Sequence, residues 1–245
     1  MWWMIVVGGI VALLFLTTYI CFHITFRADR RLENEEFPIP DGEIYVPYRE
    51  QMVQWMKDLR ALPCEELTVT STDGLTLYGR YYEYAPDAPI EIMFHGYRGS
   101  AERDLCGGVQ RAFALGHSVM LVDQRTSGKS GGHVITFGIR ERYDCVKWVE
   151  RLSERFPDRP ILLTGISMGA ATVTMAAPMV SERVVGVLAD CGYTSPRAII
   201  CKVIRDLHLP PVLLYPFVKL GARLFGGFDL EEASSVEALK TCRVR

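Results

Sequence analysis

The chain has 245 residues, a formal net charge of -2 and an apolar fraction of 49%, which is enough for one sizeable α/β core. The near-neutral charge gives no reason to expect a nucleic acid as partner. The seven cysteines are scattered without a C-x-x-C pair, so the sequence predicts no metal site and no disulfide framework, and it favours a reducing compartment.

Residues 5–26 are uncharged and mostly apolar, and as a helix of ~33 Å they are long enough to cross a bilayer core. A secretory signal peptide and a buried core helix are the alternatives. However, no basic residue precedes the apolar run, and no small-x-small cleavage site follows it before the charges. Because Arg27, Arg30 and Arg31 follow the span, the positive-inside rule places the rest of the chain in the cytoplasm. We therefore expect residues 1–31 to form a single-pass anchor in the cell membrane with its basic flank.

A linker and an N-terminal helix are expected over residues 32–64. The linker carries acidic residues together with Pro38 and Pro40. The helix is predicted to open at Pro47 and to run to about Leu62, because one apolar stripe recurs at helical spacing. We expect this stripe to pack against the domain that follows.

Residues 65–245 show the pattern of an α/β domain. Two alternating stretches flank Asp73 and Gly74 and predict an antiparallel hairpin. Strand-like runs then alternate with helix-like runs, which implies a mostly parallel sheet with right-handed crossovers. The predicted strands are 66–71, 75–82, 90–94, 118–122, 161–164 and 184–189, and the predicted helices are 101–115, 139–156 and the segment after Ser167. Ligands of such sheets bind at the carboxyl ends of the strands.

The segment 196–228 breaks this alternation. Its apolar residues suit one or two amphipathic helices interrupted by Pro210 and Pro211, and no run resembles a strand. We expect a helical cap over the strand edge, with an ordinary crossover helix as the alternative. A short helix over 231–239 is predicted to follow.

The motif Gly165-Ile166-Ser167-Met168-Gly169 lies between a predicted strand and a predicted helix. This G-x-S-x-G spacing is typical of a nucleophile elbow, a sharp turn that exposes the serine hydroxyl. We expect Gly165 and Gly169 to have no room for a β-carbon, because the turn brings neighbouring backbone close. The helix beginning near Met168 would direct free N–H groups at a developing oxyanion. By itself, the pattern fits a glycine-rich turn with an incidental serine equally well.

Together with this elbow, three further motifs resemble the α/β-hydrolase fold, and most of all the membrane-anchored bacterial branch near serine aminopeptidase-like and carboxylesterase-like enzymes. The resemblance implies Ser167 as nucleophile and an oxyanion hole made by the backbone N–H groups of Met168 and Tyr97. It implies a structural role for His95 in its turn with Gly96, and no cofactor. It extends from about residue 65 to the end and rests on the segments 95–100, 123–125 with 128–130, 165–169 and 189–195.

The chain departs from the family in its last part. The family's triad follows the order serine, acid, histidine, but no histidine follows His208. We therefore expect the usual acid and base, and the last two strands of the sheet, to be absent through C-terminal truncation. Asp190 could orient a histidine or fix a turn, and His133 or the cap residue His208 could approach Ser167.

We predict an α/β-hydrolase that acts on an ester, thioester or amide through an acyl-enzyme on Ser167, with activity impaired in this chain. The alternative is a non-catalytic, membrane-anchored binding or scaffold protein on a degenerate hydrolase fold. The predicted partners are a small-molecule or acyl substrate and the lipid bilayer, the latter through residues 5–26. No nucleic acid, metal or cofactor is expected.

Overall fold

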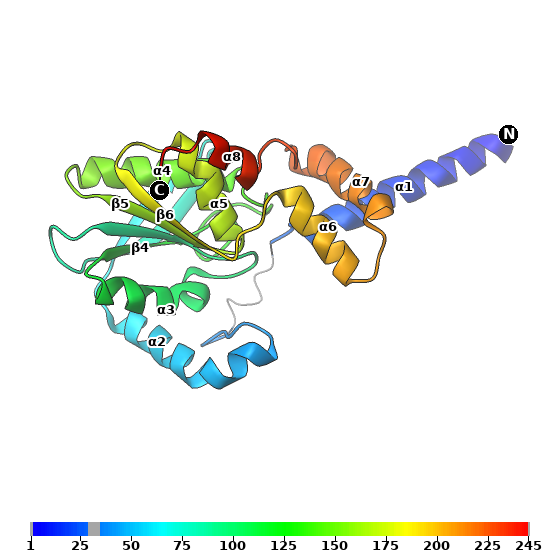
Figure 1. Ribbon diagram of the computed structural model, residues 1–245. Coiled ribbons are helices and arrows are strands. Elements are labelled where there is room, and N and C mark those ends of the chain that lie inside the picture. Colours follow the sequence, from blue (N-terminus) through cyan, green and yellow to red (C-terminus); the bar gives the residue numbers. More distant parts are fainter. Residues whose placement is uncertain (1, 29–34, 245) are drawn as a thin grey trace.

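The computed structural model describes residues 2–28 and 35–244 (Figure 1). Arg30 and Arg31, two of the three arginines behind the predicted membrane topology, lie outside the described residues. The described chain forms an α/β body, a set of cap helices, and a long N-terminal helix that projects away from the body.

Among the described residues, a six-stranded sheet forms the centre of the body, with the strand order β1-β2-β4-β3-β5-β6. β2 pairs antiparallel with both β1 and β4, whereas the pairs β3–β4, β3–β5 and β5–β6 are parallel. The predicted hairpin and the predicted parallel crossovers are both confirmed. From β1 to β6 the strands span Glu65–Thr70, Thr76–Tyr82, Ile90–Phe94, Ser118–Asp123, Ile161–Ile166 and Val184–Asp190.

Helices cover both faces of this sheet (Figure 1). One face carries two of them, α2 (Arg49–Ala61) and α3 (Ala101–Ala114). The other face carries α4 (Glu141–Arg155) and α5 (Met168–Ala176), and α8 (Ser235–Thr241) packs on α5. Because both faces are covered, β3 is buried at every position, as expected for a strand inside a parallel sheet. The indole of Trp148 on α4 is fully buried in the core.

Local capping decides where the helices begin. The Ser100 hydroxyl accepts a hydrogen bond from the Arg103 amide and caps α3, as its position before a helical pattern predicts. Pro47, however, lies inside a 3-10 turn, Glu43–Tyr48, and the α-helix starts only at Arg49. The predicted start was therefore two residues too early. Proline supplies a helical φ but no N–H, so it fits a 3-10 turn as well as a first α-helical turn.

The segment after β6 is helical throughout, as predicted. It contains α6 (Pro196–Asp206), α7 (Pro211–Gly221) and a π-helical turn, Ala222–Gly226. Ser195 caps α6 by accepting a hydrogen bond from the Ala198 amide, and Pro210 and Pro211 separate the two helices. We call α6, α7 and the π-helical turn the cap. The cap packs on loops at the carboxyl edge of the sheet through its own small core, which contains Phe137, Ile139, Ile200, Ile204, Tyr215 and Val218.

The N-terminal helix α1 (Trp2–Phe26) is long and apolar enough to cross a membrane. Its residues 2–16 are exposed, but its last turn enters the protein. There Phe26 is fully buried between the rings of Phe137 and Phe228. The chain then pairs with the loop before α4, where the Ile135 amide donates to the Phe26 carbonyl at 2.8 Å. The far end of α1 lies well outside the body (Figure 1).

Candidate active site

Ser167 occupies the turn between β5 and α5 with φ 53° and ψ -112°. A positive φ is strained for a residue with a β-carbon, and such strain concentrates at functional sites. Two backbone hydrogen bonds hold the turn: the Ser167 amide donates to the Asp190 carbonyl at 2.8 Å, and the Ala171 amide donates to the Ser167 carbonyl at 3.1 Å. The side chain of Ser167 is half-exposed, so the turn presents its hydroxyl at the carboxyl edge of the sheet.

The two glycines of the motif allow β5, α5 and β3 to approach one another. A β-carbon on Gly165 would lie 2.2 Å from the Gly169 carbonyl carbon, and one on Gly169 would lie 2.0 Å from the Phe94 carbonyl oxygen. Both neighbours are backbone, so no side chain can move to make room. As expected from the sequence, neither Gly165 nor Gly169 has room for a β-carbon.

The turn after β3 lies directly beside this elbow. A β-carbon on Gly96 would lie 3.6 Å from the Ser167 β-carbon. The Gly96 amide donates to Asp104 Oδ2 at 2.9 Å, while the next residue, Tyr97, stacks its ring on Phe137 with centroids 5.0 Å apart. Sequence reasoning missed Asp104. The available signal was an acidic residue in the first turn of the helix that follows the His-Gly turn.

His95 is buried and is held at both ring nitrogens. The Gln124 amide donates to His95 Nε2 at 3.2 Å, so the ring proton is on Nδ1, which lies 2.9 Å from the Gly96 carbonyl oxygen. The Gln124 side chain also donates to the His95 carbonyl at 2.6 Å. These contacts place His95 as a support of its turn. Gln124 belongs to the motif at residues 123–125. Its hydrogen bonds to His95 could not be predicted from the sequence, because the two residues are 29 positions apart.

Arg125, next to Gln124, ties the loop after β4 to the rest of the body. Its guanidinium forms two hydrogen bonds with the Asp144 carboxylate, at 2.7 and 2.8 Å, and both side chains are buried. It also reaches Asp73 in the hairpin turn at 3.0 Å. This bidentate pairing fixes the orientation of the loop, and with it the residue that holds His95.

Asp73→Asn is expected to remove part of the pH dependence of stability. Burial by itself would raise the pKa of Asp73, but hydrogen bonds from Arg125 and Ser71 lower it to about 2. The folded pKa is therefore below the unfolded value of about 3.9. The stabilisation is present above pH ~4 and is lost as the pH falls towards 2. Thermal unfolding midpoints should fall more steeply from pH 5 to pH 2.5 in the wild type than in the variant. If the thermal unfolding midpoints of the wild type and the variant differed by the same amount at pH 5 and at pH 2.5, this role of Asp73 would be contradicted.

The other predicted site residues lie on three different segments: the end of β6, the loop before α4 and the turn between α6 and α7. Asp190 ends β6 beside Ile166 and has an exposed side chain. His133 is exposed in the loop that pairs with the end of α1. His208 is exposed in the turn between α6 and α7, ~16 Å along α6 from its start. Within the part of the chain that the structure describes, no hydrogen bond joins Ser167 Oγ to a histidine.

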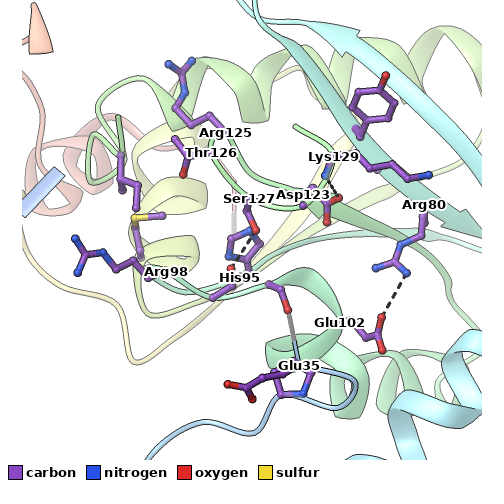
Figure 2. A pocket seen from close by; sticks show the side chains of 18 of the residues that line it. Glu35, Arg80, His95, Arg98, Glu102, Asp123, Arg125, Thr126, Ser127 and Lys129 are labelled. Atoms are coloured by element: carbon purple, nitrogen blue, oxygen red, sulfur yellow. Dashed lines mark hydrogen bonds and ion pairs between the residues drawn. The ribbon is translucent and has the colours of Figure 1, made fainter. Parts of the chain in front are cut away.

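A cavity of about 400 Å³ adjoins this site (Figure 2). His95 and Met168 line it on the side of the elbow, and Asp123, Arg80 and Glu102 line it on the side of β2, β4 and α3. Ser167 is not among its lining residues. The cavity therefore lies next to the elbow on the side of His95 and Met168, and it has a mixed-charge wall, in which Arg80 pairs with Glu102. Among the described residues, no group of three His, Cys, Asp or Glu side chains could hold a metal ion.

The fold and the site together define an α/β hydrolase. The model of the family described as serine aminopeptidase, S33 matches residues 86–213, which are more than half of the chain and include the turn after β3, the elbow and the start of the cap. The chain belongs to this family, whose class is that of esterase- and peptidase-like enzymes.

Two curated relatives match a similar portion of the chain. The uncharacterized protein YqkD of Bacillus subtilis is 28% identical over 128 residues, which are 51% of this chain and 42% of that protein. The polyketide transferase ATR5 of Stachybotrys chlorohalonatus is 27% identical over 135 residues, which are 53% of this chain and 45% of that protein. The chain thus spans less than half the length of these relatives.

Solved structures agree on the fold. An esterase of Pyrococcus furiosus superposes with a TM-score of 0.59 at 24% identity, covering 89% of this chain and 75% of the esterase. An α/β hydrolase of Vibrio vulnificus superposes with a TM-score of 0.56 at 19% identity, covering 82% and 66% of the two chains. The predicted α/β-hydrolase fold is confirmed.

Proposed function

We propose that the protein is a serine hydrolase that transfers an acyl group to water through an acyl-enzyme on Ser167. The observation that carries the proposal is the strained turn at Ser167, which lies next to Gly96 in the turn after β3. In this geometry the hydroxyl oxygen attacks the carbonyl carbon of an ester at the strand edge, the bond from that carbon to the alcohol oxygen breaks, and the alcohol leaves with the serine proton. Water then attacks the acyl-enzyme and releases the carboxylic acid, which restores the Ser167 hydroxyl. A carboxylic ester is the preferred substrate class, followed by thioesters and amides.

The oxyanion hole is proposed to consist of the backbone N–H groups of Met168 and Tyr97. Met168 is the first residue of α5, so its N–H belongs to the first helical turn, where amides lack helical partners. Tyr97 directly follows the glycine that lies against Ser167. Donors preorganised in this way stabilise the charge that develops on the carbonyl oxygen, and each contributes roughly 3–4 kcal/mol in serine hydrolases.

Two histidines of the described chain are candidates for the base that activates Ser167. Both ring nitrogens of His95 are held within its own turn. His117 lies elsewhere: its Nδ1 atom is 3.2 Å from the carboxylate of Glu91, which is in the amino half of β3, whereas Ser167 lies at the carboxyl edge of the sheet. His133 and His208 remain as candidates. A serine in a complete elbow without its base keeps only a small residual rate, so we expect Ser167 to react slowly.

Labelling with a fluorophosphonate probe tests the proposal. The full chain, purified in detergent, is expected to be labelled slowly at Ser167, and Ser167→Ala should abolish the signal. Ser195→Ala is the matched control, because Ser195 lies in the same edge region but serves only to cap α6. It should label like the wild type. Signal that persists in Ser167→Ala would show that another residue reacts and would contradict the proposal.

Two further variants locate the base. If His133 or His208 is the base that activates Ser167, then His133→Ala or His208→Ala lowers the labelling rate, because no imidazole is left at that position to accept the serine proton. Labelling at the wild-type rate in both folded variants would exclude both histidines as the base.

A non-catalytic binding protein on the same fold is the second candidate. It is favoured by one observation: among the described residues, Ser167 Oγ has no histidine partner. This candidate predicts that the chain is folded, as judged by circular dichroism, but is not labelled by the probe at any pH. The labelling experiment therefore distinguishes the two candidates.

We further propose that α1 anchors the protein in the cell membrane as a single span, with the hydrolase body in the cytoplasm. The end of the helix supports a retained anchor over a cleaved signal sequence. Phe26 is part of the cap core, the Tyr97 hydroxyl donates to the Thr25 carbonyl at 2.8 Å, and Arg98 donates to the Ile24 carbonyl at 2.7 Å. Cleavage after this helix would remove a fully buried ring from the folded protein.

A further inference from the structure

The helix α7 of the cap is apolar on every side. Lys219 is its one charged residue, and the Lys219 ammonium pairs with Glu231. A helix without a polar face is found either inside a large protein or within a membrane. In this structure α7 is at the surface, so part of its apolar side is uncovered.

Three sides of α7 have different surroundings. Tyr215 and Val218 are buried in the cap core. Gly221 lies against α1, where an added β-carbon would meet the Phe22 side chain at 2.9 Å. Leu213 and Leu220 lie seven residues apart, which places them on one face of the helix. Leu224 follows four residues after Leu220 and continues this face. That third side is exposed: Leu213 is 65% exposed and Leu220 45%, and Leu224, in the π-helical turn that follows α7, is 59% exposed. With Val212, which is 84% exposed, these leucines form what we call the outer face of the cap.

The cap is packed along the anchor helix itself. The ring of Phe225, in the π-helical turn, contacts Phe15, Tyr19 and Phe22 with centroids 5.5 Å apart in each case. These three residues cover two turns of α1. Figure 1 shows α7 beside α1, on the same side of the body. Any membrane that surrounds this stretch of α1 therefore also meets the cap.

The length of α1 indicates that the membrane does reach this stretch. Residues 2–16, each of which is exposed, form a segment ~22 Å long at ~1.5 Å per residue. A hydrocarbon core is ~30 Å thick, so α1 spans it only if about five more residues enter the bilayer. Those residues reach to about Cys21, which directly precedes Phe22, the residue that contacts Gly221 and Phe225.

We propose that the outer face of the cap is a second membrane contact, inserted in the lipid of the leaflet next to the body. This inference rests on the proposed anchor. The hydrocarbon boundary then lies at the level where α7 packs on α1, and the exposed leucines contact acyl chains instead of water. The two contacts together fix the orientation of the body, with the carboxyl edge of the sheet, which carries Ser167, turned towards the bilayer.

Tryptophan quenching by brominated phosphatidylcholine tests this contact. Leu224→Trp and Leu213→Trp are made in the full chain carrying Trp2→Phe and Trp3→Phe, which leaves Trp55 and Trp148 in the body. Leu115→Trp is the matched control, because Leu115 is 60% exposed at the end of α3, away from the cap. Each protein is reconstituted into vesicles with bromine at a known depth of the acyl chain, and folding is checked by circular dichroism.

We expect the emission added by Leu224→Trp to fall by at least half, and more with bromine at carbons 6 and 7 than at carbons 11 and 12. Emission from Leu115→Trp should not change. The wild type, with Trp2 and Trp3, reports on the anchor separately. Quenching in the wild type together with none at position 224 would overturn the cap contact alone. No quenching in either protein would overturn the anchor as well.

Discussion

Gly169→Ala is expected to lower the free energy of unfolding by ~3 kcal/mol or more. The new β-carbon would lie 2.0 Å from the Phe94 carbonyl oxygen and 2.8 Å from that of His95. Overpacking of a tight core costs ~1–3 kcal/mol, and here the obstacle is backbone on a buried central strand, which cannot rotate away. The strand end and the turn at His95 would have to shift, so we also expect labelling of Ser167 to be lost.

Gly108→Ala is the matched control for this prediction. Gly108 lies within α3, and its added β-carbon would meet the flexible Met93 side chain, with the sulfur at 3.4 Å and the methyl carbon at 3.9 Å. Because alanine favours a helix over glycine by ~1 kcal/mol, this variant should be as stable as the wild type or slightly more so. Urea unfolding of the full chain in detergent, followed by circular dichroism, measures both. If Gly169→Ala were as stable as Gly108→Ala, β5, α5 and β3 would not pack as tightly as described.

Arg125→Met is expected to cost ~3–5 kcal/mol, because it leaves the buried Asp144 carboxylate without its partner. The side chains of Arg125 and Asp144 are only 2% and 5% exposed. Loss of the guanidinium also frees the loop that carries Gln124, the residue that holds His95. We therefore expect weaker labelling at Ser167 even under conditions in which the variant is still folded.

Two variants separate the cost of the unpaired charge from the loss of the arginine itself. In Arg125→Met with Asp144→Leu, no buried charge remains, and at least half of the lost stability should return, since apolar replacements of buried ion pairs are often neutral. Arg155→Met removes a pair of similar length, 2.8 Å to Glu65, in which both partners are more than 40% exposed. It should cost less than ~1 kcal/mol. An equal cost for Arg125→Met and Arg155→Met would contradict the burial of the Arg125–Asp144 pair.

Most of the α/β body could be predicted from local sequence. Alternation around Asp73 and Gly74 identified the hairpin, and Ser100 identified the start of α3. These signals are local because turn and cap chemistry depends on a few neighbouring residues. The glycines of the elbow were identified for the same reason: a sharp strand-to-helix turn needs them wherever the strand lies in the sheet. Pro47 shows the limit, because proline fits two kinds of helical turn.

The supports of the site could not be predicted. Asp104 holds Gly96, Gln124 holds His95, and Arg125 joins Asp144 to the hairpin turn. The first of these bonds joins residues only eight positions apart, whereas the others join segments whose proximity depends on the tertiary arrangement of the strands and helices. β3 and β4 are neighbours in the sheet, although a whole helix separates them in the chain. No spacing rule in the sequence contains that information.

The sequence by itself determined the class of fold, the position of Ser167 in an elbow and the apolar length of α1, since each follows from periodicity, glycine placement or composition within one segment. Only the tertiary structure decided that Phe26 is fully buried in the core of the cap, that α7 packs along α1, and that His208 lies at the far end of α6. These features arise where apolar surfaces from distant segments are buried together, and burial of that kind depends on the complete three-dimensional arrangement.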